Sequence, residues 1–194
     1  MMRSTSVLVL AGLILGMLSA PAGAGEATDQ IRADIDELYR SVQGAGPGLA
    51  QEAASGRAVL DRMFDWSAMA EASLRGHWQT RTPAERAEFT KLFADLFARG
   101  YLTRVNLVDA SRFQYLGDTT VGDRTMVKTK VFTKKDSPID VDYLVRSTGG
   151  SRWRVQDIQV ESISLVDNYR VQFDSIITRS SYDDLVKRLR ATAK

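Results

Sequence analysis

The sequence predicts an α+β fold, in which helices pack on one face of a curled antiparallel sheet of four strands. Apolar residues recur at helical spacing between residues 27 and 106, whereas between residues 113 and 160 they alternate with polar residues at period two. The links between the alternating segments are short, as expected for antiparallel strands that follow one another along the chain. Helical spacing returns at Leu165, so helices precede and follow the sheet.

Residues 1–24 are predicted to be a secretory signal peptide rather than part of this fold. Arg3 supplies a basic start, Val7–Leu18 is an apolar run, and Ala22-Gly23-Ala24 offers the small residues of a cleavage site. The apolar run is short for a bilayer span, which makes an uncleaved anchor the less favoured alternative. Residues 25–194 are then expected to form a single domain, because the chain shows no internal repeat.

The composition argues against several classes of function. The chain has 26 basic and 24 acidic side chains, and this balance argues against nucleic acid as a partner. The absence of cysteine excludes disulfides and thiol chemistry. His77 is the one histidine, which is too few for a zinc site of the His/Cys type. We therefore expect no catalytic residue, no metal site and no cofactor.

Helices are expected at residues 27–43, 49–63, 65–74 and 83–106, from Leu165 to at least Ile176, and from Ser181 onward. The clearest start is at Thr82, which can form a capping box with Glu85, while Pro83 suits the first helical position. The helix at 83–106 carries the widest apolar stripe, which by default is ordinary core. Its members are Phe89, Leu92, Phe93, Leu96, Phe97 and Tyr101.

The first two strands are expected on either side of a glycine-containing turn. The first strand spans Phe113–Leu116, and the turn spans Gly117–Gly122. The second strand spans Arg124–Phe132, and its two lysines lie on one face. The opposite face is therefore expected to point inward, with Val127, Thr129 and Val131.

The third and fourth strands are expected to form a hairpin around residues 147–151. The inward face of the third strand is predicted to carry Ile139, Val141, Tyr143 and Val145, and the solvent face Asp140, Asp142 and Arg146. The fourth strand begins at Trp153. Its alternation slips by one residue between Val155 and Ile158, which indicates a bulge near Asp157.

Residues Trp153–Phe173 read WRVQDIQVESISLVDNYRVQF, and this segment resembles the C-terminal motif of the MlaC / toluene-tolerance family of periplasmic lipid-binding proteins. The matching residues are Trp153, Val155, Asp157, Ser164, Leu165, Val166, Asn168, Tyr169, Arg170, Gln172 and Phe173. Gly76-x-Trp78 followed by Thr82–Arg86 and Phe89 matches a second, upstream motif. Ser162 departs from the family, which usually has glycine there; a positive φ at this position would strain serine.

The resemblance implies a sheet like the cone of nuclear-transport-factor-like folds, closed by helices around an apolar cavity. It also implies a periplasmic carrier of glycerophospholipid. Its partners would be an inner-membrane ABC transporter complex with a membrane-anchored lipid-binding subunit, and an outer-membrane lipoprotein–porin complex. The side chains expected to line the cavity are Phe93, Leu96, Phe97, Tyr101, Val127, Val131, Ile139, Val141, Tyr143, Val145, Val155, Leu165, Val166, Tyr169 and Phe173.

Two rival functions stay open at this point. Some relatives are associated with hopanoids, so another lipid is one alternative. The other is a cone-fold enzyme that uses Tyr143 or Asp157, because carboxylates can be catalytic in such pockets. The pattern favours solvated or structural roles for Asp140, Asp142 and Asp157. His77 is likewise expected to be structural.

Arg170 has two interpretations. It could hold a lipid phosphate, because guanidinium geometry suits that group. The favoured alternative is an ion pair with a neighbouring acid, either Asp167 or Asp174.

Overall fold

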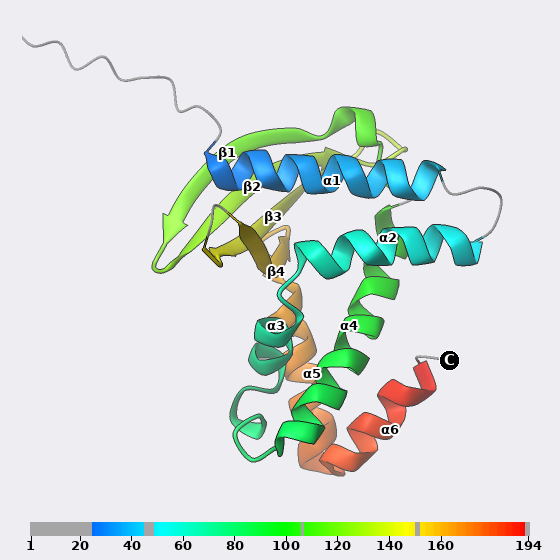
Figure 1. Cartoon of the computed structure of the whole chain (residues 1–194), viewed down its shortest axis with the longest axis vertical. Helices are drawn as coiled ribbons and strands as arrows, with labels where there is room; N and C mark the ends of the chain where they lie inside the picture. Colours follow the sequence, from blue (N-terminus) through cyan, green and yellow to red (C-terminus); the bar gives the residue numbers. More distant parts are fainter. Residues whose placement is uncertain (1–24, 45–48, 106, 150–151, 193–194) are drawn as a thin grey trace, which may run out of the picture.

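The computed structural model describes residues 25–44, 49–105, 107–149 and 152–192. The predicted leader at residues 1–24 and part of the predicted hairpin at residues 150–151 lie outside this range. The elements in chain order (Figure 1) are α1 (Glu26–Gly44), α2 (Leu49–Met63), α3 (Trp66–Leu74), the 3₁₀ turn η1 (Arg75–His77), α4 (Pro83–Val105), the 3₁₀ turn η2 (Ala110–Arg112), β1 (Gln114–Val121), β2 (Arg124–Phe132), β3 (Pro138–Ser147), β4 (Trp153–Val160), β5 (Ile163–Ser164), α5 (Leu165–Arg179) and α6 (Tyr182–Thr192).

The sheet is antiparallel, with the strands in the order β1-β2-β3-β4-β5. The prediction of four strands was wrong, because Ile163 pairs with Val160 and adds the short strand β5. The expected turn at Gly117–Gly122 was also wrong. Leu116 is the extra residue of a bulge within β1, Gly117 follows it with a φ of 101°, and the chain turns only after Val121.

The predicted slip in the fourth strand is confirmed. Leu144 of β3 pairs with Asp157, whereas Val145 pairs with Val155, so Gln156 is the extra residue of a bulge. The inward face of β2 is also confirmed, since Val127, Thr129 and Val131 are buried. The bulge keeps Val155 and Ile158 both buried, although they lie three residues apart.

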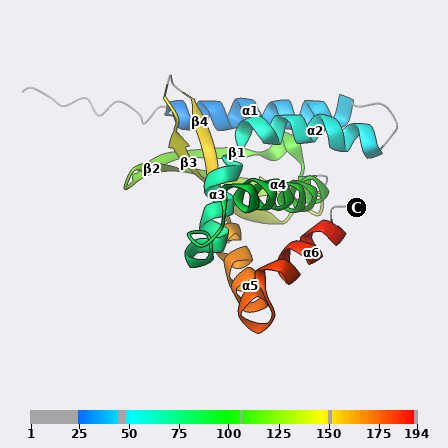
Figure 2. The same cartoon turned by 60° about the horizontal axis from the view of Figure 1, so that its bottom comes forward.

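The helices form two groups (Figures 1 and 2). Helix α1 lies on the sheet with α2 alongside it, and α4, α5 and α6 extend away from the sheet. Gln30 of α1 closes the edge of β4, because its side-chain amide exchanges two hydrogen bonds of 2.9 Å with the backbone of Trp153. This contact fixes α1 against the sheet.

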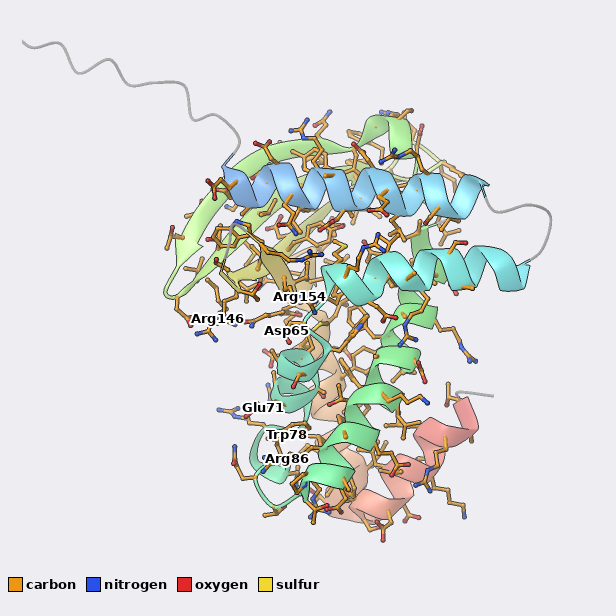
Figure 3. The ribbon with its side chains drawn as sticks, viewed as in Figure 1. Asp65, Glu71, Trp78, Arg86, Arg146 and Arg154 are labelled. Carbon is orange, nitrogen blue, oxygen red and sulfur yellow. The ribbon has the colours of Figure 1, made fainter. Side chains whose placement is uncertain are left out.

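The residues before α3 join the two groups. Phe64 bridges to Val155 of β4, and Arg154 donates from Nη1 to the Phe64 carbonyl at 3.2 Å. Asp65 caps α3 by accepting from the Ala68 amide at 3.1 Å, as predicted. Figure 3 shows Asp65 and Arg154 near each other at this junction. The helical group therefore begins directly from the sheet edge.

The predicted capping box of α4 is present. The Thr82 amide donates to Glu85 Oε2 at 2.7 Å, and the Glu85 amide donates to Thr82 Oγ1 at 3.3 Å. Arg86, in the same first turn, lies over the Trp78 ring at 5.3 Å (Figure 3). These contacts fix the loop between η1 and α4, so the direction of α4 is set at its first turn.

The core continues from the sheet into the helical group. Under α1, the buried side chains include Ile31, Leu38, Val127, Tyr143 and Val145. Among the helices, Phe89 and Phe93 of α4 are buried against Phe173 of α5, and Phe97 is buried against Tyr169 of the same helix. The aromatic stripe predicted for α4 is thus largely interior. Within the described residues, no helix combines the length and apolar character needed to cross a membrane.

Candidate functional site

A pocket of about 240 Å³ lies between α4 and α5. Each helix contributes four residues to its lining. Helix α4 provides Phe97, Gly100, Tyr101 and Arg104, and α5 provides Leu165, Asn168, Tyr169 and Gln172. These residues differ sharply in exposure: Phe97 is buried, whereas Arg104, Asn168 and Gln172 are exposed. The pocket therefore has an aromatic interior and a polar mouth.

The interior is built from aromatic rings in mutual contact. The Phe97 ring centroid lies 6.1 Å from that of Tyr169 and 6.4 Å from that of Tyr101. Phe93 lies below them, with its centroid 5.6 Å from that of Tyr169. Such clusters offer a large apolar surface and few polar atoms, which suits a hydrocarbon ligand.

The mouth carries one cation that is free of acidic partners. Arg104 donates from Nη1 to the Gly100 carbonyl at 2.9 Å, and no carboxylate of the described chain lies within salt-bridge distance of it. A Cβ atom at Gly100 would lie 3.2 Å from Arg104 Nη1, so glycine lets the guanidinium approach the helix surface. Arg104 keeps further N–H groups that can donate to an anion.

Helix α5 is positioned by the end of β4. Asp157 Oδ1 accepts from the Ile158 amide at 2.8 Å and from the Val166 amide at 3.1 Å. Ser164 caps the helix by accepting from the Asp167 amide at 3.0 Å. Burial raises the pKa of Asp157, and its hydrogen bonds partly offset that shift. Asp157 thus joins the strand to the helix, in line with the structural role predicted for it.

The turn into β5 requires two left-handed residues. Glu161 has a φ of 49° and Ser162 a φ of 67°. Such values at both central residues are typical of a type I′ hairpin turn, which favours glycine and asparagine. The backbone expected at the usual family glycine is therefore present, and Ser162 adopts it with a side chain.

Arg170 and His77 both pair with acids of α5. Arg170 Nε donates to Asp167 Oδ1 at 2.8 Å, which is one of the two predicted ion pairs. Asp174, the other candidate, lies 2.8 Å from His77 Nε2 instead. Across the described chain there is no cluster of three acidic or histidine side chains that could hold a metal ion.

Helix α4 reaches the sheet through a pair of tyrosines. The Tyr101 hydroxyl lies 3.2 Å from that of Tyr143, which is 1% exposed on β3. Burial raises the pKa of Tyr101 to about 12 and that of Tyr143 well above its usual value. Both hydroxyls therefore stay protonated at neutral pH.

The sequence-predicted cavity residues fall into three places. Four line the pocket: Phe97, Tyr101, Leu165 and Tyr169. Phe93, Val166 and Phe173 are buried among the helices, and Leu96 is half-buried there. The remaining seven lie on the sheet, where Val127, Val131, Tyr143, Val145 and Val155 are buried and Ile139 and Val141 are half-buried.

Sequence reasoning missed the other four pocket residues: Gly100, Arg104, Asn168 and Gln172. Asn168 and Gln172 belong to the motif segment Trp153–Phe173. Both are polar, however, and the predicted cavity lining consists of apolar and aromatic side chains. Arg104 follows Gly100 by four residues and Tyr101 by three, so all three lie on one face of α4. This spacing was the signal that could have placed Arg104 beside the predicted cavity residue Tyr101.

Comparisons with known proteins add two findings. A family model described as MlaC protein matches residues 32–191. A phospholipid-binding protein from Ralstonia solanacearum, solved in complex with a phospholipid, is 20% identical and superposes with a TM-score of 0.69. That match covers 88% of this chain and 97% of the other, and it shows a shared fold. A search of curated proteins found no match.

Proposed function

Since the chain belongs to the MlaC family, we propose that it binds a glycerophospholipid and carries it across an aqueous compartment. The observation that carries the proposal is the pocket between α4 and α5, with aromatic rings inside and Arg104 at its mouth. The relative from Ralstonia solanacearum holds a phospholipid on the same fold, which supports the same ligand class here.

The energetics of an acyl chain explain why such a carrier is needed. Exposing hydrocarbon to water costs about 0.8 kcal/mol per methylene, so a chain of about 14 methylenes costs roughly 11 kcal/mol. A protein interior replaces one apolar medium by another, which brings transfer from bilayer to protein near balance. Binding alone then gives no direction to transport, and a partner must supply it.

The pocket is smaller than the ligand it is proposed to hold. Its volume of about 240 Å³ lies below the range of roughly 300–1,000 Å³ that is usual for small-molecule sites. Loading therefore requires α4 and α5 to part, or α4 to move from the sheet, so that the tails enter a cone-like cavity between helices and sheet. The predicted cavity residues on β2, β3 and β4 would then contact the tails.

The charge at the mouth fits a phosphate. Arg104 has free N–H donors and no acidic partner in the described chain, whereas Arg170 is held by Asp167. Charge-assisted hydrogen bonds between guanidinium and phosphate are among the stronger polar contacts. The headgroup would thus stay at the solvent-exposed mouth.

We place the carrier in the periplasm, with residues 1–24 as a cleaved leader and residues 25–194 as one lipid-binding domain. Its partners would be an inner-membrane ABC transporter complex, whose membrane-anchored subunit also binds lipid, and an outer-membrane lipoprotein–porin complex. A carrier function predicts that lipid is moved without being changed.

The test is to purify the protein from periplasm, identify bound lipid by mass spectrometry and follow transfer of labelled phospholipid to acceptor vesicles. Leu165→Asp should lower retained lipid at least tenfold, because a charge in an apolar pocket is costly to desolvate. Leu116→Asp places the same charge on an exposed site of β1, 58% exposed, and should retain wild-type levels.

Three results would contradict the proposal. One is a protein that retains no diacyl lipid and takes none from vesicles. Another is equal retention in Leu165→Asp and wild type. The third is lysolipid or free fatty acid that stops accumulating in His77→Ala, which would indicate a hydrolase. If the protein retains a polycyclic lipid instead, its ligand is a hopanoid and not a phospholipid.

A further inference from the structure

Four tyrosines from four elements meet in the interior between α1, α4 and the sheet. They are Tyr39 of α1, Tyr101 of α4, Tyr115 of β1 and Tyr143 of β3, and we call them the tyrosine cluster. The hydroxyls of Tyr101 and Tyr143 lie 3.2 Å apart, and Tyr39 and Tyr115 pack against the same core. Burial raises the pKa of Tyr143, and the other three tyrosines add to that shift. Tyr101 also lines the pocket, so the cluster is continuous with it.

The cluster leaves hydroxyl protons without an acceptor. A tyrosine hydroxyl carries one proton, and the contact between Tyr101 and Tyr143 uses one of their two. The Tyr115 hydroxyl is buried without a hydrogen-bond partner among the described residues. Tyr39 donates to the Val105 carbonyl at 3.5 Å, at the limit of a hydrogen bond. Two hydroxyl protons of the cluster therefore lack an acceptor among the described residues.

This arrangement is unfavourable unless something accepts those protons. A buried donor without a partner loses its hydration and gains no hydrogen bond in return. Phenylalanine would fill nearly the same space without that penalty. The unpaired hydroxyl protons therefore point to an acceptor that is bound during function.

We propose that the tyrosine cluster donates hydrogen bonds to the ester carbonyl oxygens that join the acyl chains of the bound lipid to glycerol. The inference rests on the proposed function and names the part of the lipid that this region recognises. An uncharged acceptor fits the cluster, because its four side chains are neutral. A phosphate would instead remain with Arg104.

The spacing along α4 supports this assignment. Tyr101 and Arg104 line the same pocket three residues apart, which is about 4.5 Å along a helix axis. In a glycerophospholipid, the phosphate and the esters are likewise separated by only the few bonds of the glycerol. A phosphate at Arg104 would therefore bring the esters to Tyr101. The tails would continue into the apolar core beyond it.

The experiment compares lipids that differ only in the carbonyls. Delipidated protein is mixed with vesicles containing equal amounts of diester and diether phosphatidylethanolamine, with matched chain lengths, and the bound lipid is quantified by mass spectrometry. We expect the wild type to take up the diester form in about 2- to 10-fold excess, the effect of one net hydrogen bond.

Single variants assign the preference to the cluster. Tyr143→Phe and Tyr115→Phe keep the ring and remove the donor, so each should bring the ratio of diester to diether uptake towards one. Tyr182→Phe is the matched control, because its hydroxyl donates to the Glu85 carbonyl at 3.3 Å outside the cluster, and it should keep the wild-type ratio. Circular dichroism and thermal unfolding check that each variant is folded.

Each result decides one of the two claims. Equal uptake of both lipids by the wild type overturns the ester assignment and leaves the carrier function standing. A preference that survives in Tyr143→Phe and Tyr115→Phe overturns it as well. An equal gain in affinity for both lipids in those variants also overturns the ester assignment, because it would mean that the hydroxyls only hold water. Failure of the wild type to take up either lipid overturns the proposed function itself.

Discussion

At the scale of single residues, Ser162 has a backbone conformation that its side chain disfavours. Its φ of 67° lies in the left-handed region, which costs a non-glycine residue about 1 kcal/mol or more. Ser162→Gly should therefore raise the free energy of unfolding by about 0.5–1 kcal/mol, measured by urea denaturation. Ser175→Gly, within α5, is the control and should lower it, because glycine weakens a helix interior. An unchanged or reduced stability of Ser162→Gly would contradict this view of the turn.

Residues with local signals were predictable from the sequence. The capping box at Thr82 and the cap at Asp65 depend only on neighbours in the chain, and both are present. The tyrosine cluster was not predictable as a unit, because its hydroxyls come from positions 39, 101, 115 and 143. Tyr101 and Tyr143 were each expected to be inward-facing, but no sequence pattern shows that their hydroxyls meet.

At the scale of elements, α1 is capped by a residue from another element. Its N-cap, Gly25, has no side chain, and Asp118 of β1 accepts from the Thr28 amide at 3.3 Å and from Thr28 Oγ1 at 2.8 Å. A Cβ atom at Gly25 would lie 2.4 Å from Asp118 Oδ2. The carboxylate thus occupies the place of a normal N-cap side chain and joins α1 to the sheet.

A double-mutant cycle tests this cap. Gly25→Ala should be destabilising because its methyl group overlaps the Asp118 carboxylate. Asp118→Ala should be destabilising because the Thr28 amide loses its acceptor. Each variant should lower the free energy of unfolding by about 1 kcal/mol. The double variant should lose less than the sum, since alanine at position 25 then meets no carboxylate. Urea denaturation measures all four proteins. Strictly additive losses would show that the two residues act independently.

Element boundaries show where sequence patterns were insufficient. The long helices and β2 to β4 were predicted within a few residues, because each has a sustained apolar period. Gly117 alone does not distinguish a turn from a bulge, because glycine with a positive φ occurs in both. The strand β5 has only two residues, which is too short for any period to be visible.

At the scale of the whole molecule, the α+β class and the antiparallel sheet followed from the order of the patterns. The pocket could not be predicted in this way, because its walls are helices α4 and α5, and all five strands lie between these helices in the sequence. Its position depends on how α5 leaves β4, and that angle is set by Asp157, Ser164 and the turn at Glu161 and Ser162.

The arrangement predicts which part of the molecule responds to lipid. A pocket of about 240 Å³ must open to admit tails, and the lipid then fills the space between the elements that part. Backbone amides of α5 from Leu165 to Gln172 should therefore exchange hydrogen more slowly in lipid-loaded than in delipidated protein, because ligand binding suppresses local opening. Hydrogen–deuterium exchange with mass spectrometry measures this difference directly.

The first half of helix α1, Glu26–Asp34, provides the internal reference for that measurement. It is held to the sheet by Gln30 and by the contact of Thr28 with Asp118, away from the pocket and from Tyr39, so its exchange should be the same in both states. Glycerophosphoethanolamine, which has the headgroup but no tails, should leave α5 unprotected, because the opening is filled by hydrocarbon. Protection that appears in α1 but not in α5, or with the headgroup alone, would place the lipid elsewhere than between α4 and α5.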